Sequence, residues 1–158
     1  LPLRALSSIV HVLPFWRSSS DGGFAIASHE ALEPRFGDWD DLEALSRGRL
    51  LMADLVLNHV SASHPWVHQC LQDAEPGRSC ILQASPDPCW SQVVRPRSSP
   101  LISPLGGRKQ VWTTFGPDQV DLNWQEPEVL RHFARLMQRL FRHGVGWLRL
   151  DAVGYVWK

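Results

Sequence analysis

The chain has 158 residues, and its sixteen basic and sixteen acidic side chains give a formal net charge of zero. This balance argues against a nucleic-acid-binding protein and against a polybasic protein of the membrane surface. Hydrophobic residues make up 44% of the chain, enough for a core, which argues against wholesale disorder. No apolar run approaches the roughly 18 residues of a membrane span, and the opening stretch lacks the basic head and cleavage site of a secretory signal.

Three cysteines, Cys70, Cys80 and Cys89, give an odd count in a chain too large to need disulfide bonds. This usage predicts reduced thiols in a cytoplasmic protein, with one disulfide bond as the less favoured alternative. His64 and His68 lie near Cys70, but the closely paired cysteines of a zinc site are missing. The sequence therefore favours ordinary surface and loop roles for these residues over a metal site.

The first sixty residues alternate between short apolar runs and polar segments. Residues 8–14 (SIVHVLP) predict a short buried strand, and residues 17–24 (RSSSDGGF) predict a polar loop. Asp38 is placed to cap a short helix over residues 39–48. The mostly apolar run 50–60 is typical of a strand that is covered on both faces, as in a parallel sheet.

The second half begins with a different composition. Residues 61–110 are rich in proline and hold all three cysteines, which predicts a loop-rich excursion long enough to be a small subdomain. Pro127 opens a predicted helix that runs to about His143, and residues 146–156 predict a final strand. The expected apolar side of this helix consists of Leu130, Phe133, Leu136, Met137, Leu140 and Phe141.

This alternation of strands and helices is typical of βα units in an α/β fold. In the last strand Arg149 and Asp151 share one face, while Leu148 and Leu150 share the other. Asp54 likewise lies on the face opposite to the leucines of its strand. We expect the leucines to pack under helices and the charged side chains to point into a barrel or crevice, where α/β enzymes place their chemistry.

Four segments in this order resemble the α-amylase superfamily, which is family 13 of the glycoside hydrolases. Residues 54–59 (DLVLNH) and 147–152 (WLRLDA) are similar to the motifs of the family's third and fourth strands. Residues 119–123 (QVDLN) and 20–24 (SDGGF) resemble its motif near the end of the inserted B domain and its sugar-binding segment after the second strand. Longer stretches, among them VVRPR, VWTTFGPDQVDLN and LDAVGYVWK, resemble the sucrose phosphorylase branch, which includes glucosylglycerate phosphorylases.

The resemblance implies a partial (β/α)₈ TIM barrel, of which the whole takes about 250 residues. Residues 1–60 would form its strands two and three, and residues 61–110 an inserted loop-rich B domain. Residues 111–158 would return to the barrel with the helix and strand four, which carries the nucleophile. The acid/base Glu and a third carboxylate would lie outside this chain. We therefore expect a fragment truncated at both ends that is inactive alone.

Retaining glucosyl transfer needs two carboxyl groups about 5–5.5 Å apart. The resemblance implies that Asp151 is the nucleophile and that Arg149 holds it ionised through charge and hydrogen bonding. A purely structural Arg–Asp pair at a strand end is the alternative. Asp54 is expected to brace its loop, and Asn58, which binds calcium in many amylases, is expected to hold no metal in this branch.

The resemblance also implies a set of substrate-binding residues. Sugar hydroxyls would be bound by polar side chains and the ring by apolar walls, while an arginine would bind phosphate or the departing acceptor. The polar side chains are Asp21, His59 and Gln119, the apolar walls are Phe24 and Phe115, and the arginine is Arg97. Plain core packing of the two phenylalanines, an ordinary turn at Asp21 and a solvated loop arginine are the alternatives.

Two further expectations concern histidines and one departure from the family pattern. His11, His132 and His143 have no evident partner and are expected to be structural or surface residues. Ser28-His29 stands where many relatives have an Asp followed by Tyr or His, so an ionic role for Ser28 is not expected.

The predicted function is retaining α-glucosyl transfer from sucrose or a related glucoside to inorganic phosphate, with phosphate as a co-substrate and without a cofactor. A hydrolase or transglucosylase of the same family and a non-catalytic remnant are the alternatives. The predicted partners are a small sugar and phosphate, with neither nucleic acid nor membrane, and the oligomeric state and the acceptor stay open.

Overall fold

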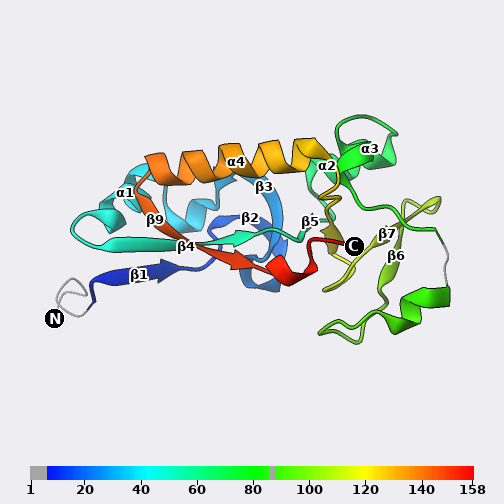
Figure 1. Cartoon of the computed structure of the whole chain (residues 1–158). Coiled ribbons are helices and arrows are strands. Elements are labelled where there is room, and N and C mark those ends of the chain that lie inside the picture. Colours follow the sequence, from blue (N-terminus) through cyan, green and yellow to red (C-terminus); the bar gives the residue numbers. More distant parts are fainter. Residues whose placement is uncertain (1–6, 86–87) are drawn as a thin grey trace.

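The computed structural model describes residues 7–85 and 88–158 (Figure 1). Its centre is a parallel sheet with the strand order β1-β4-β9, formed by β1 (Ile9–Val12), β4 (Leu50–Val56) and β9 (Val145–Asp151). Helix α1 (Trp39–Ser46) precedes β4, and helix α4 (Pro127–Arg142) precedes β9. The predicted α/β alternation is therefore confirmed.

The helices begin where the sequence predicts. Asp38 caps α1, because its side chain accepts hydrogen bonds from the backbone N–H groups of Asp40 and Asp41. Pro127 opens α4, which lies along one face of the sheet (Figure 1). The buried side of α4 consists of Val129, Phe133, Leu136 and Leu140, which join the same core as the sheet.

The expected apolar side of α4 is wrong at two positions. Leu130 is 62% exposed and Phe141 is 51% exposed. Val129 is buried instead of Leu130, because the buried residues follow the spacing of three and four from Val129 onward. The contact with the core is thus a narrow stripe, and Leu130 and Phe141 lie outside it.

The strand register places the charged residues as predicted. Asp54 pairs with Arg149 and Val56 pairs with Asp151 between the parallel strands β4 and β9. Leu55 is buried on the opposite face. Leu150, however, is 46% exposed, so the expectation that it packs under a helix is wrong, because no described element covers this end of β9.

The polar segment after β1 is a hairpin and not the predicted loop. Strand β2 (Trp16–Ser20) pairs antiparallel with β3 (Ala25–Leu32), and Asp21–Gly23 form a short helical turn between them. Gly23 has a φ of 110°, and a Cβ there would lie 2.8 Å from the Pro14 carbonyl oxygen. Only glycine therefore fits this turn without a shift of the backbone.

The apolar run 50–60 is divided between two sheets, so the prediction of one strand is wrong. After β4 ends at Val56, β5 (His59–Ser61) pairs antiparallel with β8 (Gln119–Asp121). The buried Asn58 lies at the break and donates a hydrogen bond to Asp121, 2.9 Å away. The chain leaves the parallel sheet at this contact, which joins residues 63 positions apart. The apolar content of the run cannot predict such a contact.

The segment between β5 and β8 has secondary structure of its own. It contains α2 (Pro65–Leu71), α3 (Gly77–Cys80) and the antiparallel pair β6 (Ile102–Leu105) and β7 (Lys109–Trp112), at the end of the molecule away from α1 (Figure 1). Cys70 and Cys80 are buried, and burial raises the pKa of the Cys80 thiol to about 12.

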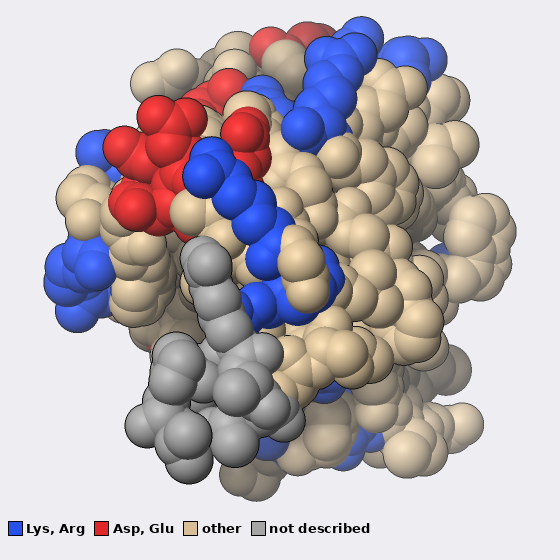
Figure 2. All heavy atoms as spheres, turned by 90° about the vertical axis from the view of Figure 1, so that its left-hand side faces the viewer, with Lys and Arg blue, Asp and Glu red and all other residues tan. Residues whose placement is uncertain are grey.

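Two features describe the surface. Within the described residues, none of the helices combines the length and apolarity that a bilayer crossing requires. On the end of the molecule that carries α1, acidic and basic side chains lie next to one another and form no large field of a single sign (Figure 2).

Candidate active site

Seven side chains that the sequence singled out line one pocket of about 250 Å³. They come from the β2–β3 turn, from the segment before β6, from strands β5 and β8 and the loop before β8, and from the carboxyl end of β9. They are Asp21, Phe24, His59, Arg97, Phe115, Gln119 and Asp151. The eighth, Arg149, lies beside this pocket, and its Nη1 is 3.0 Å from Asp151 Oδ1.

Arg149 is shared between two carboxylates. Its Nη1 also donates to Oδ1 of Asp54, a side chain that is fully buried. The hydrogen bond and the negative charge of Asp54, together with the charge of Asp151, raise the pKa of Arg149. The guanidinium therefore stays positive and fixes the position of the Asp151 carboxylate at the strand end.

His11 completes this line of charged groups. Its Nε2 is 2.8 Å from Oδ2 of Asp54, so Asp54 connects β1 and β9 across the central strand β4. Asp54 thus braces neighbouring strands, and the expectation that it braces a loop is wrong. The sequence also missed the partner of His11, although a lone polar residue within the apolar run of β1 is a signal for one.

His59 is held as a neutral imidazole inside the pocket wall. Burial lowers its pKa, and the charges of Asp121 and Asp151 offset this only in part. The Asn58 amide lies 3.3 Å from Nδ1, and Nε2 lies 3.2 Å from the Phe24 carbonyl oxygen. A carbonyl oxygen can only accept, so the Phe24 carbonyl assigns the ring proton to Nε2 and leaves Nδ1 to accept from the Asn58 amide. The Gln119 amide nitrogen also lies 3.1 Å from Nε2, and with the proton there its hydrogen bond goes to Asp21 instead of the ring.

The remaining lining residues supply an amide–carboxylate pair and aromatic faces. Gln119 Nε2 donates to Asp21 Oδ2 over 2.8 Å. The ring of Phe115 lies 5.2 Å from the ring of His59 and 5.2 Å from that of Tyr155, measured between centroids. Polar groups that converge beside an aromatic face are suited to a small polyhydroxylated ligand.

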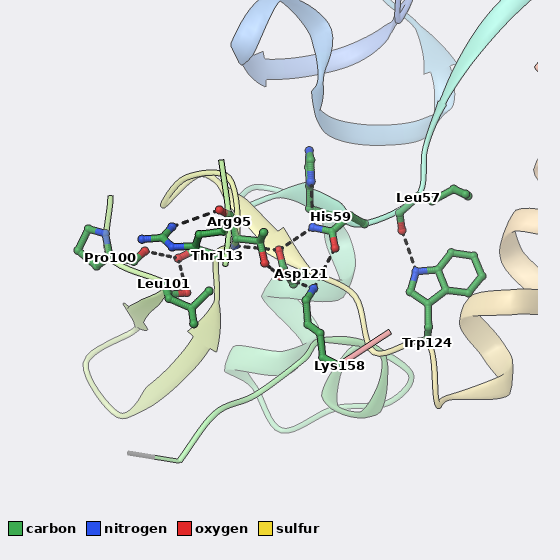
Figure 3. A network of polar contacts seen from close by, with 11 residues as sticks. Leu57, His59, Arg95, Pro100, Leu101, Thr113, Asp121, Trp124 and Lys158 are labelled. Carbon is green, nitrogen blue, oxygen red and sulfur yellow. Dashed lines mark hydrogen bonds and ion pairs between the residues drawn. The ribbon is translucent and has the colours of Figure 1, made fainter. Parts of the chain in front are cut away.

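A buried polar network lies behind His59 (Figure 3). Asp121 is fully buried and accepts hydrogen bonds from Asn58 and from the hydroxyl of Thr114. The Lys158 ammonium donates to Asp121 Oδ2 and, over 2.9 Å, to Asn58 Oδ1. Burial lowers the pKa of Lys158, while the charge of Asp121 opposes that shift. Lys158 therefore supplies the positive charge that the buried carboxylate needs.

The sequence missed both Asp121 and Lys158. Asp121 lies inside the QVDLN segment, which was a usable signal, whereas nothing local to Lys158 points to its partners 37 and 100 positions away. The two arginines of the RPR segment have different surroundings. Arg95 donates a hydrogen bond to the Thr114 carbonyl oxygen over 3.2 Å (Figure 3), whereas Arg97 lines the pocket. Among the described residues, no cluster of three or more His, Cys, Asp or Glu side chains is arranged to hold a metal ion.

Comparison with known proteins places this geometry in a family. Residues 7–158 match the sequence profile described as "Alpha amylase, catalytic domain". A glucosylglycerate phosphorylase from Allomeiothermus silvanus is 45% identical over 159 residues, which cover 99% of this chain and 29% of that protein. A sucrose phosphorylase from Agrobacterium vitis is 31% identical over 172 residues, which cover 99% of this chain and 35% of that protein.

A solved structure has the same arrangement of elements. The crystal structure of sucrose 6F-phosphate phosphorylase from Thermoanaerobacter thermosaccharolyticum matches with a TM-score of 0.91 at 27% identity, over 99% of this chain and 36% of that one. The chain thus spans between 29% and 36% of the length of these relatives. Because the family profile matches from residue 7 to the last residue, the chain belongs to the family of the α-amylase catalytic domain.

Proposed function

We propose that this chain is the nucleophile-bearing part of a retaining glycoside phosphorylase, which transfers an α-glucosyl group from sucrose or a related glucoside to inorganic phosphate. The observation that carries the proposal is the pocket in which Asp151, held by Arg149, faces His59 and the Asp21–Gln119 pair. Relatives at 45% and 31% identity that are named as phosphorylases support the same reaction.

In the proposed architecture, β1, β4 and β9 are strands two to four of a (β/α)₈ barrel, and residues 61–110 are the core of an inserted B domain. The parallel order β1-β4-β9 supports this, as does the position of Asp151 at a carboxyl strand end. The chain covers 29% to 36% of its relatives, so the acid/base Glu and the third carboxylate are proposed to lie in the rest of a longer enzyme.

The Asp151 carboxylate attacks the anomeric carbon as the bond from this carbon to the leaving oxygen breaks. The acid/base carboxyl group protonates that oxygen and later takes the proton of the acceptor phosphate, which displaces Asp151 with net retention. Neutral His59 donates its Nε2 hydrogen to a sugar hydroxyl in place of the Phe24 carbonyl. Arg97 binds phosphate oxygens or the departing acceptor, a role suited to its planar fork.

The deciding experiment measures products of the full-length enzyme that carries this chain, with glucosylglycerate and with sucrose as donors. We expect α-glucose 1-phosphate to form only when phosphate is present. Equal release of glucose with and without phosphate would identify a hydrolase, and transfer to a second sugar would identify a transglucosylase. No turnover of either donor would favour a non-catalytic remnant.

We also propose a cytoplasmic enzyme. The buried thiols of Cys70 and Cys80 fit a reducing compartment, and a phosphorolytic enzyme depends on a pool of inorganic phosphate. The proposed partners are a small sugar and phosphate, with neither nucleic acid nor membrane.

A further inference from the structure

One carboxylate outside the pocket connects three segments of the chain. Oδ2 of Asp118 accepts hydrogen bonds from the hydroxyls of Ser19 and Ser20, each over 2.5 Å. Oδ1 accepts from the Ala62 backbone N–H over 3.2 Å and from the Ser61 hydroxyl over 3.3 Å. We call Asp118 with Ser19, Ser20 and Ser61 the serine clamp. It joins the end of β2, the end of β5 and the start of β8.

The serine clamp lies directly beside two pocket residues. Ser20 precedes Asp21 in the chain, and Asp118 precedes Gln119, whose amide donates to Asp21 Oδ2. Two consecutive residues, Ser20 and Asp21, are therefore hydrogen-bonded to two other consecutive residues, Asp118 and Gln119. Contacts between residues 98 positions apart are what bring this side of the pocket together.

The turn that carries Asp21 needs such support. Asp21 has a φ of 55°, in the left-handed region that costs energy for a residue with a Cβ, and Gly22 and Gly23 follow with φ of 62° and 110°. A conformation of this kind persists only when surrounding contacts determine it. Asp21 is also exposed, so packing does little to hold its side chain.

The partners of Asp118 are suited to positioning. Burial alone would raise the pKa of Asp118, but the hydrogen bonds from Ser19, Ser20, the Ala62 amide and Ser61 hold it below its ordinary value. None of the ion pairs found within residues 7–85 and 88–158 involves Asp118. Hydrogen bonds from hydroxyls and an amide fix the orientation of the carboxylate, because a hydrogen bond weakens steeply when it is misaligned.

We propose that Asp118 is a positioning residue for the sugar pocket, holding Ser19 and Ser20 so that Asp21 and Gln119 stay aimed at the substrate. The inference rests on the proposed function, because the aim of these two side chains matters only if the pocket binds a sugar. Asp118 is not among the residues that line the pocket. Its effect passes through the hydrogen-bonded pair of Asp21 and Gln119, which Asp21→Ala removes.

The test uses the full-length enzyme and two variants, Asp118→Ala and the nearly isosteric Asp118→Asn. For Asp118→Ala we expect the KM of the glucosyl donor to rise about tenfold, with a much smaller change in kcat, since hydrogen bonds to a charged group are lost. Asp73→Asn is the matched control, because Asp73 is a carboxylate bonded to Lys109 that lies outside the pocket. An unchanged KM in both Asp118 variants would overturn the proposal.

A double-mutant cycle separates positioning from general stability. If Asp118 acts through Asp21, Asp118→Asn adds no further loss of kcat/KM in an Asp21→Ala background. Additive losses would mean that Asp118 acts by another route, and the proposal would be wrong.

A readout without activity keeps this inference distinct from the proposed function. Backbone hydrogen exchange in residues 18–24 should become about tenfold faster in Asp118→Asn, while α4 stays unchanged. Unchanged exchange in residues 18–24 would overturn the clamp even in an active enzyme. If the parent enzyme transfers no glucosyl group, the proposed function fails, and faster exchange still shows that Asp118 orders the turn.

Discussion

Arg149 bridges two carboxylates that lie in different surroundings. Asp54 is fully buried and Asp151 is partly accessible at the pocket, so the single guanidinium joins a structural anchor to a group that can react. The second partner of Asp54, His11, adds another donor to the anchor. This arrangement lets the strand ends hold Asp151 without burying it, which a nucleophile requires because substrate must reach it.

Asp151→Asn in the full-length enzyme tests the proposed nucleophile. Asn keeps the size of the side chain and an oxygen for Arg149, but it removes the negative charge that attacks the anomeric carbon. We expect turnover to fall by at least about 10³-fold with an unchanged melting temperature, because covalent catalysis is lost while the fold is kept. Appreciable activity measured by glucose 1-phosphate formation would show that the nucleophile is assigned wrongly.

Lys158→Met tests the buried pair behind His59. It removes the ammonium from Asp121 and leaves a fully buried carboxylate without its cation, which costs about 3–5 kcal/mol of unfolding free energy. Lys109→Met is the matched control, since its partner Asp73 is exposed, and its free energy of unfolding should fall much less than that of Lys158→Met. Urea denaturation measures both, and equal losses would contradict a special role of Lys158.

At the scale of elements, the sequence predicted the features that depend on local patterns, which are the helix starts and the faces of the strands. The starts of α1 and α4 follow from Asp38 and Pro127, and the shared face of Asp54 and Arg149 follows from strand parity. The sequence did not predict the hairpin β2–β3, because β2 shows no alternation of apolar residues. Two of its serines are exposed and bond to Asp118, which lies about a hundred positions away in the chain.

The same distinction applies to the candidate site. Motif resemblance gathered the residues that line the pocket, because their types recur in short local patterns. Asp118 and Lys158 were missed because their roles depend on partners that the fold alone brings close. Their types and neighbours in the chain look like those of any loop or terminal residue.

A group of histidines joins α4 to the hairpin and to α2. His29 Nδ1 lies 3.2 Å from His132 Nε2, and the His29 ring lies 5.8 Å from that of His64. Burial lowers the pKa of all three, and that of His64 falls to about 3. The folded chain therefore keeps these imidazoles neutral at a pH where unfolded histidines take up protons.

This group predicts acid sensitivity of the fold. Unfolded histidine has a pKa of about 6.5, so below that pH the unfolded state binds more protons and stability falls, whereas above it the contribution is complete. In His29→Leu, the slope of the unfolding free energy between about pH 6.5 and 5 should decrease by about 1 kcal/mol per pH unit on average. Denaturation series at several pH values measure it, with His68→Leu, an exposed histidine, as control. An unchanged slope in His29→Leu would show that the buried group does not govern the response.

At the scale of the whole molecule, the C-terminal side of the sheet is apolar and open. β9 is an edge strand, and Trp147, Leu150, Val153 and Trp157 are 55%, 46%, 48% and 73% exposed. An unpaired strand edge beside exposed apolar side chains favours pairing with another chain. In the proposed longer enzyme, the barrel strand that follows would cover this surface.

We therefore expect the isolated 158-residue chain to associate as its concentration rises, because the edge of β9 and its apolar side chains find partners in other copies. Light scattering after size-exclusion chromatography measures the mass. Leu150→Lys places a charge on the edge and should shift the chain toward the monomer, whereas Val94→Lys, at a 91% exposed loop position, should not. A chain that stays monomeric at every concentration would show that this surface needs no cover, and it would weaken the assignment of β9 as an inner strand of a larger barrel.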